Sequence, residues 1–414
     1  MLDMFFLKPE IAQSKYVRFP SIILRLITFR FLKDKALLRF RPDSGSVFPR
    51  WLMFMIAFLV LSSGAKALTF TKEPYLQHVT KNSIIICWET DEPFSAVVRY
   101  GDTKQLGQFI DIPGRETFHE VTLTGLKAAT DYYFMVEAGE LKYKGKFRSA
   151  PNSGDPFRMV IYGDFRVGPV ENTLVKRMIK KKPVVVVTLG DYLSDGQEPT
   201  LWPHLFRTIL PIAKKFPYYV SLGNHEKDSS MYFKYFAMPG NERWYSFDYG
   251  NIHFVALDSN SPYRYNPEQK KWLKEDLKQA RKNIQETPFI FVYFHHPPFG
   301  TGKRHGDFEL AQTWSPIFEK YKVDAVWCGH EHQYERIMVK KVLYIISGGG
   351  GAALYDFVYD DAFTVKRAKE YHYMLLDVKK DVVYVKAISL EGRTFDEFEI
   401  INRQLKQSDK AISE

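Results

Sequence analysis

The chain has 414 residues, of which 45% are apolar and 26% are charged, a balance typical of globular proteins. At about 150 residues per domain, this length allows two or three domains. The net charge is +10, but residues 1–67 alone hold eleven Lys and Arg against four acidic residues. The remainder is only slightly basic. This argues against nucleic acid as a structural partner, because such a partner requires a concentrated basic face.

Residues 1–67 are predicted to form a leader with a secretory signal. Arg50 precedes an apolar run over 51–61, and Ala65-Lys66-Ala67 follows it as a cleavage site of the A-x-A type. The run is shorter than the roughly 20 apolar residues of a membrane-spanning helix, so we expect no stable membrane span in the mature chain. We expect export to the periplasm, the cell surface or the medium. Because the run starts so late, translation from Met53 or Met55 is an alternative.

Residues 68–150 are predicted to form an all-β domain. Short alternating segments are separated by turn sequences and show no helical period. The predicted strands are 83–88, 95–100, 119–123, 132–138 and 142–148. The domain offers no cluster of metal-binding side chains. Cys87 in this region and Cys328 further on lie in apolar segments, and we expect both to be buried free thiols.

Residues 155–402 are predicted to form a second domain, in which strands alternate with helices. A short linker, 151–154, precedes it, and a polar tail over 403–414 follows it. The predicted strands are apolar throughout, as expected for strands buried on both faces of a sheet. They comprise 157–162, 183–189, 217–222, 289–294, 323–328 and 342–347. The predicted helices are 171–182, 200–215, 267–281 and 310–321.

Five of these apolar runs end in side chains that bind metals. The segments are Gly163-Asp164, Gly190-Asp191, Gly223-Asn224-His225-Glu226, His295-His296-Pro297 and Gly329-His330-Glu331-His332. Ligands of such sheets bind at the carboxyl ends of the strands, where these residues stand. Two Asp, one Asn and three His give oxygen and imidazole donors for two metal ions. A packing requirement alone would not place these residue types at the same end of five strands.

The order of these motifs resembles that of the calcineurin-like metallophosphoesterases. Within them, the octapeptide from Gly329 to Arg336 is similar to the last motif of purple acid phosphatases. The resemblance covers roughly residues 70–400. It implies a four-layer α/β/β/α catalytic domain within an α+β, multidomain chain. The segments 73–77, 98–101 and 123–133 resemble the fibronectin-III-like β-sandwich that precedes the catalytic domain of purple acid phosphatases.

The resemblance also assigns the metal ligands. Asp191 is expected to bridge two ions, since a carboxylate has two oxygens. Asp164 and His332 would complete the shell of the first ion. The second ion would take Asn224, His295 and His330. Mixed nitrogen and oxygen shells suit Fe, Zn or Mn and do not choose among them.

The expected function is hydrolysis of a small phosphorylated substrate, a phosphomonoester, by attack of a metal-bound hydroxide. His225 and His305 are candidates for contacting the phosphate or the leaving group. His296 is expected to support the metal ligands from behind. The glycines 348–351 favour a tight turn beneath the site over contact with a phosphate.

Two positions depart from the family pattern. Purple acid phosphatases have a tyrosine ligand three residues after the bridging aspartate, where this chain has Ser194. Other metallophosphoesterases have a histidine two residues after the first aspartate, where this chain has Arg166. Arg166 is therefore a candidate for binding the phosphate with its planar donor fork. Two alternatives stay open: a phosphodiesterase or nucleotidase on the same scaffold, and a catalytically impaired phosphate-binding surface protein. The substrate and the oligomeric state also stay open.

Overall fold

The computed structural model describes residues 67–402. The predicted signal sequence and the predicted polar tail, 403–414, lie outside the described residues. Residues Ala67–Glu414 group into one compact unit. Within residues 67–402, no helix is both long and apolar enough to cross a membrane. Cys87 and Cys328 are buried free cysteines, as predicted.

The N-terminal region consists of five strands in one hydrogen-bonded sheet. They are β1 (Phe70–Gln77), β2 (Ser83–Gly101), β3 (Gln108–Thr124), β4 (Asp131–Ala138) and β5 (Leu141–Arg148). The order is β1-β2-β4-β5, with β3 also paired to β2. The predicted strands 83–88 and 95–100 are wrong as separate elements, because both belong to β2. This strand stays paired with β3 through two register shifts between Glu89 and Ala96. Such an irregularity accommodates Pro93, which cannot donate a ladder hydrogen bond.

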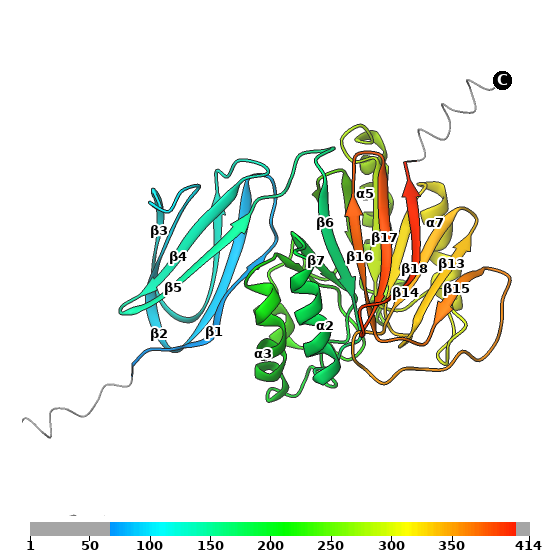
Figure 1. Cartoon of the computed structure of the whole chain (residues 1–414), viewed down its shortest axis with the longest axis horizontal. Helices are drawn as coiled ribbons and strands as arrows, with labels where there is room; N and C mark the ends of the chain where they lie inside the picture. Colours follow the sequence, from blue (N-terminus) through cyan, green and yellow to red (C-terminus); the bar gives the residue numbers. More distant parts are fainter. Residues whose placement is uncertain (1–66, 403–414) are drawn as a thin grey trace, which may run out of the picture. The chain divides into compact units, whose positions relative to one another are not determined.

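The following region contains two sheets, which lie side by side in Figure 1. The first has six strands in the order β18-β17-β16-β6-β7-β8. Its strands are β6 (Phe157–Tyr162), β7 (Val185–Thr188), β8 (Tyr218–Tyr219), β16 (His372–Val378), β17 (Val382–Ser389) and β18 (Thr394–Ile401). The second has seven strands in the order β15-β13-β14-β12-β11-β10-β9. They are β9 (Tyr245–Tyr249), β10 (Ile252–Ala256), β11 (Phe289–Phe294), β12 (Ala325–Cys328), β13 (Tyr334–Val339), β14 (Val342–Ser347) and β15 (Thr364–Ala368).

Helices cover the outer faces of the two sheets. On the six-stranded sheet lie α2 (Pro169–Lys180) and α3 (Leu201–Ala213); on the other lie α5 (Pro267–Lys282), α6 (Phe308–Thr313) and α7 (Ser315–Lys320). Two short elements, α4 (Ser230–Tyr235) and the 3-10 turn η1 (Tyr263–Tyr265), lie in connections. Alternate residues of β11 explain the layers. Phe291 and Tyr293 join the core shared with the six-stranded sheet, whereas Ile290 and Val292 pack with Leu277 of α5. The expected mixed α/β architecture is thereby confirmed.

The strands that precede the predicted metal ligands run parallel to one another within each sheet. β6 pairs with β7 and β7 with β8, while β11 pairs with β12 and β12 with β14. Their carboxyl ends therefore meet along common edges, as the sequence predicted. The predicted helix 310–321 is instead two helices, α6 and α7, with Trp314 between them. Pro316 explains the break, because proline lacks an N–H and disfavours a helical residue before it.

Candidate metal centre

Three of the predicted ligands follow a glycine at a strand end and adopt an unusual backbone conformation. Asp164, Asp191 and His330 have φ values of 59°, 57° and 68°, in the left-handed region that residues with side chains rarely occupy. Strained conformations of this kind cost about 1–3 kcal/mol each and gather at functional sites. A Cβ on the preceding Gly329 would lie 2.4 Å from a carboxylate oxygen of Asp164, so only glycine fits there.

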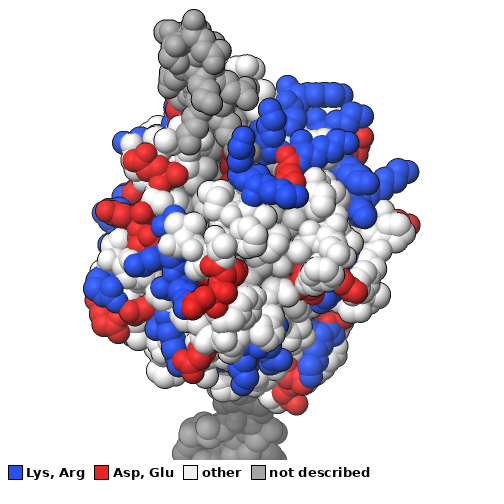
Figure 2. Space-filling model, turned by 90° about the vertical axis from the view of Figure 1, so that its right-hand side faces the viewer, with Lys and Arg blue, Asp and Glu red and all other residues white. Residues whose placement is uncertain are grey.

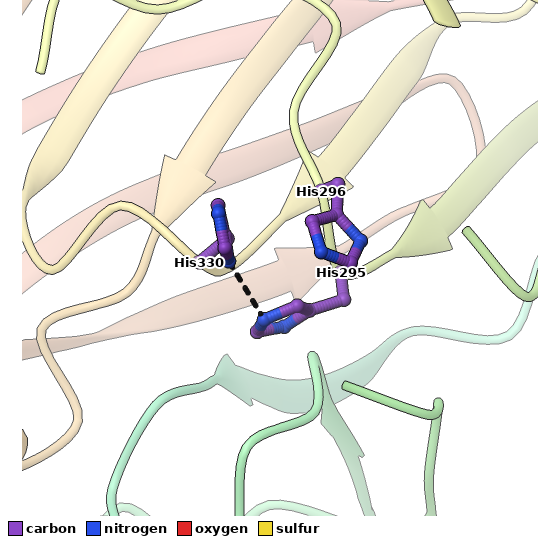
Figure 3. A group of neighbouring side chains, drawn as sticks. All are labelled: His295, His296 and His330. Carbon is purple, nitrogen blue, oxygen red and sulfur yellow. Dashed lines mark hydrogen bonds between the residues drawn. The ribbon is translucent and has the colours of Figure 1, made fainter. Parts of the chain in front are cut away.

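Four donor atoms converge on the predicted site of the second ion. The Nε2 of His295 lies 3.0 Å from the Oδ1 of Asn224 and 3.3 Å from the Oδ1 of Asp191. The Nδ1 of His330 lies 3.1 Å from the same Asn224 oxygen and 3.2 Å from the His295 nitrogen. Figure 3 shows the two histidines facing each other from the loops after β11 and β12. Donors at about 2.1 Å from one ion are separated by roughly 3.0–3.4 Å, so this group fits a metal ion.

The predicted first site contains fewer donors. The Nε2 of His332 lies 3.6 Å from Asp164 Oδ1, and this nitrogen is buried without a hydrogen-bond partner. The other ring nitrogen of His332 donates to the Ala353 carbonyl at 2.8 Å, which fixes the tautomer and leaves Nε2 with a lone pair. A buried, unpartnered imidazole nitrogen beside a carboxylate suits a metal ligand. Asp164, Asp191 and His332 remain the predicted donors of this site.

Burial sets the protonation of these groups. It lowers the pKa of His330 to about 2 and that of His332 to about 4, so both imidazoles are neutral, the form that binds metals. Burial alone would also lower the pKa of His295, but Asp191 and Asp164 raise it to about 9. Burial raises the pKa of Asp164 well above its ordinary value. Two buried carboxylates side by side require compensating positive charge, which bound cations would supply.

Glu226 holds the two central loops together. Its buried carboxylate accepts hydrogen bonds from the backbone N–H groups of Asp191 (2.9 Å), Tyr192 (2.8 Å) and Gly223 (2.7 Å). Because these groups come from the loops after β7 and β8, one side chain sets how Asp191 lies relative to Asn224. No role for Glu226 was predicted from the sequence. Its place in the Gly-Asn-His-Glu motif was the feature that could have indicated one.

Arg166 and His225 lie together at the mouth of the first site. The Arg166 guanidinium donates to His225 Nε2 at 2.7 Å and reaches Asp191 Oδ2 at 3.4 Å. His225 Nδ1 donates to the Ser194 carbonyl at 2.6 Å, so its Nε2 is the acceptor for Arg166. The structure therefore brings these two predicted residues beside Asp191.

The two hydroxyl-bearing residues after Asp191 both point elsewhere. Ser194, at the position of the family's tyrosine ligand, has an exposed side chain and contributes only its carbonyl to His225. Tyr192 is buried, and its hydroxyl donates to the Ser221 carbonyl at 2.5 Å.

His305 lies on an exposed loop, and its ring stacks on Tyr359 with centroids 5.5 Å apart. Among residues 67–402, no hydrogen bond or ion pair joins His305 to the predicted metal ligands. The loop nevertheless borders the site, because Tyr355 stacks on His332 at 4.1 Å and lies within 6.0 Å of the Arg304 guanidinium. The sequence analysis did not single out Tyr355, since a lone tyrosine in a loop carries no pattern.

His296 lies beside the second site, where its imidazole is close enough to those of His295 and His330 for the three to hold one ion. Its Nδ1 contacts the Ser259 hydroxyl at 2.9 Å, and its ring centroid is 4.4 Å from that of His330. A cavity of about 440 Å³ opens beside it, lined by Asn224, Lys227, Asp228, Asn260, Ser261, Tyr263, Arg264 and His296. The glycines 348–351 pack tightly against neighbouring backbone, and Gly350 donates to the Gly163 carbonyl at 2.9 Å. This packing agrees with the expected tight turn.

The Glu226 contacts generate a prediction. In Glu226→Gln, only one oxygen remains to accept hydrogen bonds, and the new amide N–H groups face backbone N–H groups. We expect a loss of about 1–3 kcal/mol of stability, together with faster loss of metal. Thermal melting and the metal retained after dialysis against a weak chelator measure the two effects. Glu275→Gln, on the exposed face of α5, is the matched control. Equal metal retention in the two variants would contradict the role assigned to Glu226.

Comparison with known proteins shows which proteins resemble this chain in sequence and fold. Residues 170–334 match the family model of the calcineurin-like phosphoesterases. Purple acid phosphatase 21 of Arabidopsis thaliana is 28% identical over 336 residues, which cover 71% of this chain and 74% of the relative. Probable purple acid phosphatase 20 of the same plant is 24% identical over 298 residues, 65% of this chain and 69% of the relative. The solved structure of a purple acid phosphatase from yellow lupin (Lupinus luteus) seeds superposes with a TM-score of 0.69 at 18% identity. It covers 79% of this chain and 74% of the lupin chain.

These matches agree with the motif order, the parallel strands and the convergent donor atoms described above. The chain therefore contains a calcineurin-like phosphoesterase domain and has purple acid phosphatases among its homologues, which supports a metal-dependent phosphoester hydrolase.

Proposed function

We propose that this protein is an exported phosphatase with a dinuclear metal centre that hydrolyses phosphomonoesters. The observation that carries the proposal is the convergence of Asn224, His295, His330 and Asp191 on one point, with separations of 3.0–3.3 Å. Asp191 would be shared by the two ions, and Asp164 and His332 would hold the first. When bound, two ions of Fe, Zn or Mn would supply positive charge for the phosphate oxygens and a nucleophile from water at neutral pH.

The residues at the mouth of the site bind and orient the phosphate. Arg166 presents N–H donors beside Asp191, and a guanidinium fork matches two phosphate oxygens at once. His225 holds Arg166 in place and lies near the developing charge. His305, on the bordering loop, would approach the leaving group when substrate is present.

The cavity of about 440 Å³ beside Asn224 and His296 takes the leaving alcohol. Its charged side chains are already paired: Lys227 with Asp195 at 2.6 Å, and Arg264 with Asp307. A cavity whose charges are balanced favours a polar, uncharged leaving group.

The N-terminal strands form a fibronectin-III-like domain. Along β4, buried residues alternate with more exposed ones, and this pattern supports the assignment.

Two measurements on the purified protein test the proposal: metal content and turnover of a substrate panel. We expect close to two ions per chain and faster turnover of phosphomonoesters than of phosphodiesters or nucleotides. Preferred cleavage of diesters would favour the phosphodiesterase alternative. Phosphate binding with one ion or none, and no turnover, would favour an impaired phosphate-binding protein.

Substitution of Asp191, the ligand proposed to be shared by the two ions, is the most direct test by mutation. Asp191→Ala should release both ions and lower turnover by at least about 10³-fold, because it removes the charge between the two sites. His330→Ala is the matched variant and should empty mainly the second site. Metal analysis of both proteins tells the two outcomes apart. Asp191→Ala protein that retained its metal and its activity would exclude the bridging role.

The position of Ser194 predicts the colour of the protein. The resemblance links the purple of the family to charge transfer from a tyrosine ligand to Fe(III), and here a serine with an exposed side chain stands at that position. A serine hydroxyl has no low-lying π electrons. We therefore expect the iron-loaded protein to lack the visible band. A spectrum between the blue and the near infrared measures this, and a purple wild-type protein would mean that another tyrosine reaches the metal.

Export is part of the proposal and rests on the apolar run 51–61 followed by Ala65-Lys66-Ala67. Cleavage after Ala67 would make Leu68 the first residue of the mature protein. The intact mass of the exported chain measures this. A mature chain that still begins at Met53 or Met55 would instead indicate a retained anchor.

A further inference from the structure

A second concave site lies away from the metal centre. This cavity, the basic groove, has a volume of about 720 Å³ and is lined by β5 and by the segments 179–184 and 214–217, which follow the ends of α2 and α3. Those segments lead into β7 and β8 from their amino ends. The metal ligands follow the carboxyl ends of the same strands. The basic groove and the metal centre therefore lie at opposite ends of the six-stranded sheet.

Six cationic side chains from three separate elements line the basic groove. Lys144, Lys146 and Arg148 come from β5; Lys182, Lys214 and Lys215 follow the two helices. Two of the six are neutralised, Arg148 by Asp131 at 3.1 Å and Lys214 by Glu73 at 2.6 Å. Within residues 67–402, no ion pair or hydrogen bond engages the ammonium groups of Lys144, Lys146, Lys182 and Lys215. Four uncompensated charges thus share one concavity.

Ordinary structural reasons explain each lysine singly. Lysines at the carboxyl ends of helices stabilise the helix dipole, and lysines on an edge strand such as β5 hinder aggregation. These reasons do not require the lysines of both helices and the strand to line the same cavity. Like charges held close together raise the free energy unless an anion separates them.

Helix α5 provides the contrast. Figure 2 shows Lys and Arg gathered on one side of the protein, and α5 carries Lys271, Lys274, Lys278 and Lys282 on its exposed surface. There Lys278 pairs with Glu275 at 3.5 Å, and these lysines line none of the cavities described above. A similar number of lysines is therefore present at this helix without a cavity to receive a ligand.

The walls of the basic groove are held in a defined position. The N-terminal sheet contacts the catalytic region through buried hydrogen bonds: Tyr75 to the Tyr235 carbonyl at 2.8 Å, and Tyr219 to the Val79 carbonyl at 2.7 Å. A third joins the Ala237 N–H to the Gln77 side chain at 2.6 Å. A groove between fixed walls loses little conformational entropy when a ligand binds.

We propose that the basic groove binds a polyanion made of linked phosphate groups. Lysine ammonium groups bind phosphate as point charges, whereas planar carboxylates favour the fork of arginine, and the single Arg of the groove is already paired with Asp131. Bound there, such a polymer would hold the protein by the end opposite to the metal centre and leave that centre open to small substrates.

The test compares two variants with the same loss of charge. Lys144→Gln/Lys146→Gln/Lys182→Gln/Lys215→Gln removes the free cations of the groove, and Lys271→Gln/Lys274→Gln/Lys278→Gln/Lys282→Gln removes four from α5. The protein used is residues 67–414, which form one compact unit without the basic leader. Binding of labelled inorganic polyphosphate is measured against salt concentration, after the metal ions have been removed with a chelator so that the metal centre does not take up the polymer.

We expect the groove variant to bind polyphosphate at least about tenfold more weakly. Each lost contact with a phosphate lowers the slope of log affinity against log salt concentration by about 0.7, so the loss of four contacts should reduce this slope by roughly three. The α5 variant should differ from wild type by less than about twofold, and turnover of a small phosphomonoester should be the same in all three proteins. If the groove variant melts at a lower temperature than wild type, Lys144→Gln/Lys146→Gln on the exposed side of β5 replaces it.

Three results would overturn the proposal. They are no polyphosphate binding by wild type, equal weakening in both variants, and binding of a sulfated heparin fragment as tight as that of polyphosphate. None of them bears on turnover at the metal centre, so they are distinct from a failure of the proposed phosphatase function.

Discussion

The geometry of the metal centre depends on the carboxylate of Glu226. This carboxylate lies buried between two loops and accepts hydrogen bonds from three backbone N–H groups that would otherwise have no partner. An unpaired buried N–H costs about as much as a lost hydrogen bond, so the loops have little freedom to separate. One loop presents Asp191 and the other presents Asn224. The distances among the donors of the second site therefore rest on a residue that provides no donor itself.

The ligand loops hold strained conformations that their surroundings enforce. Asp164, Asp191 and His330 have positive φ values directly after glycines. The glycines provide the space: a Cβ at Gly190, directly before Asp191, would lie 2.6 Å from the backbone nitrogen of Gly223. Close backbone packing brings the acids together, and burial keeps His330 and His332 neutral. Backbone strain and burial together favour a site suited to cations.

The fold separates two kinds of electrostatic environment along the same strands. At the carboxyl ends of β6, β7 and β12, buried acids and neutral imidazoles meet in a site suited to cations. At the amino ends of β7 and β8, lysines after the two helices meet lysines of β5 and form a site for anions. Parallel strands make this possible, because every connection crosses from one end of the sheet to the other. Each end therefore collects residues from segments far apart in the sequence.

The sequence by itself predicted the strands that lead to the candidate metal centre and the residues proposed to bind metal, while the tertiary structure decided how those residues meet. Continuous apolar runs identified β6, β11 and β14 with the observed bounds, because strands buried on both faces have no polar residues to blur their limits. The local sequence pattern did not predict that β2 is unbroken, because pairing with β3 holds it together. Nor did it predict that the helix 310–321 is divided at Trp314, which the ring of Pro316 explains. Three further features could not be predicted from the sequence. They are the contact of Arg166 with His225, the hydrogen bonds by which Glu226 joins two loops, and the basic groove. Each joins residues dozens of positions apart, and only packing brings such residues within hydrogen-bonding distance or around one cavity.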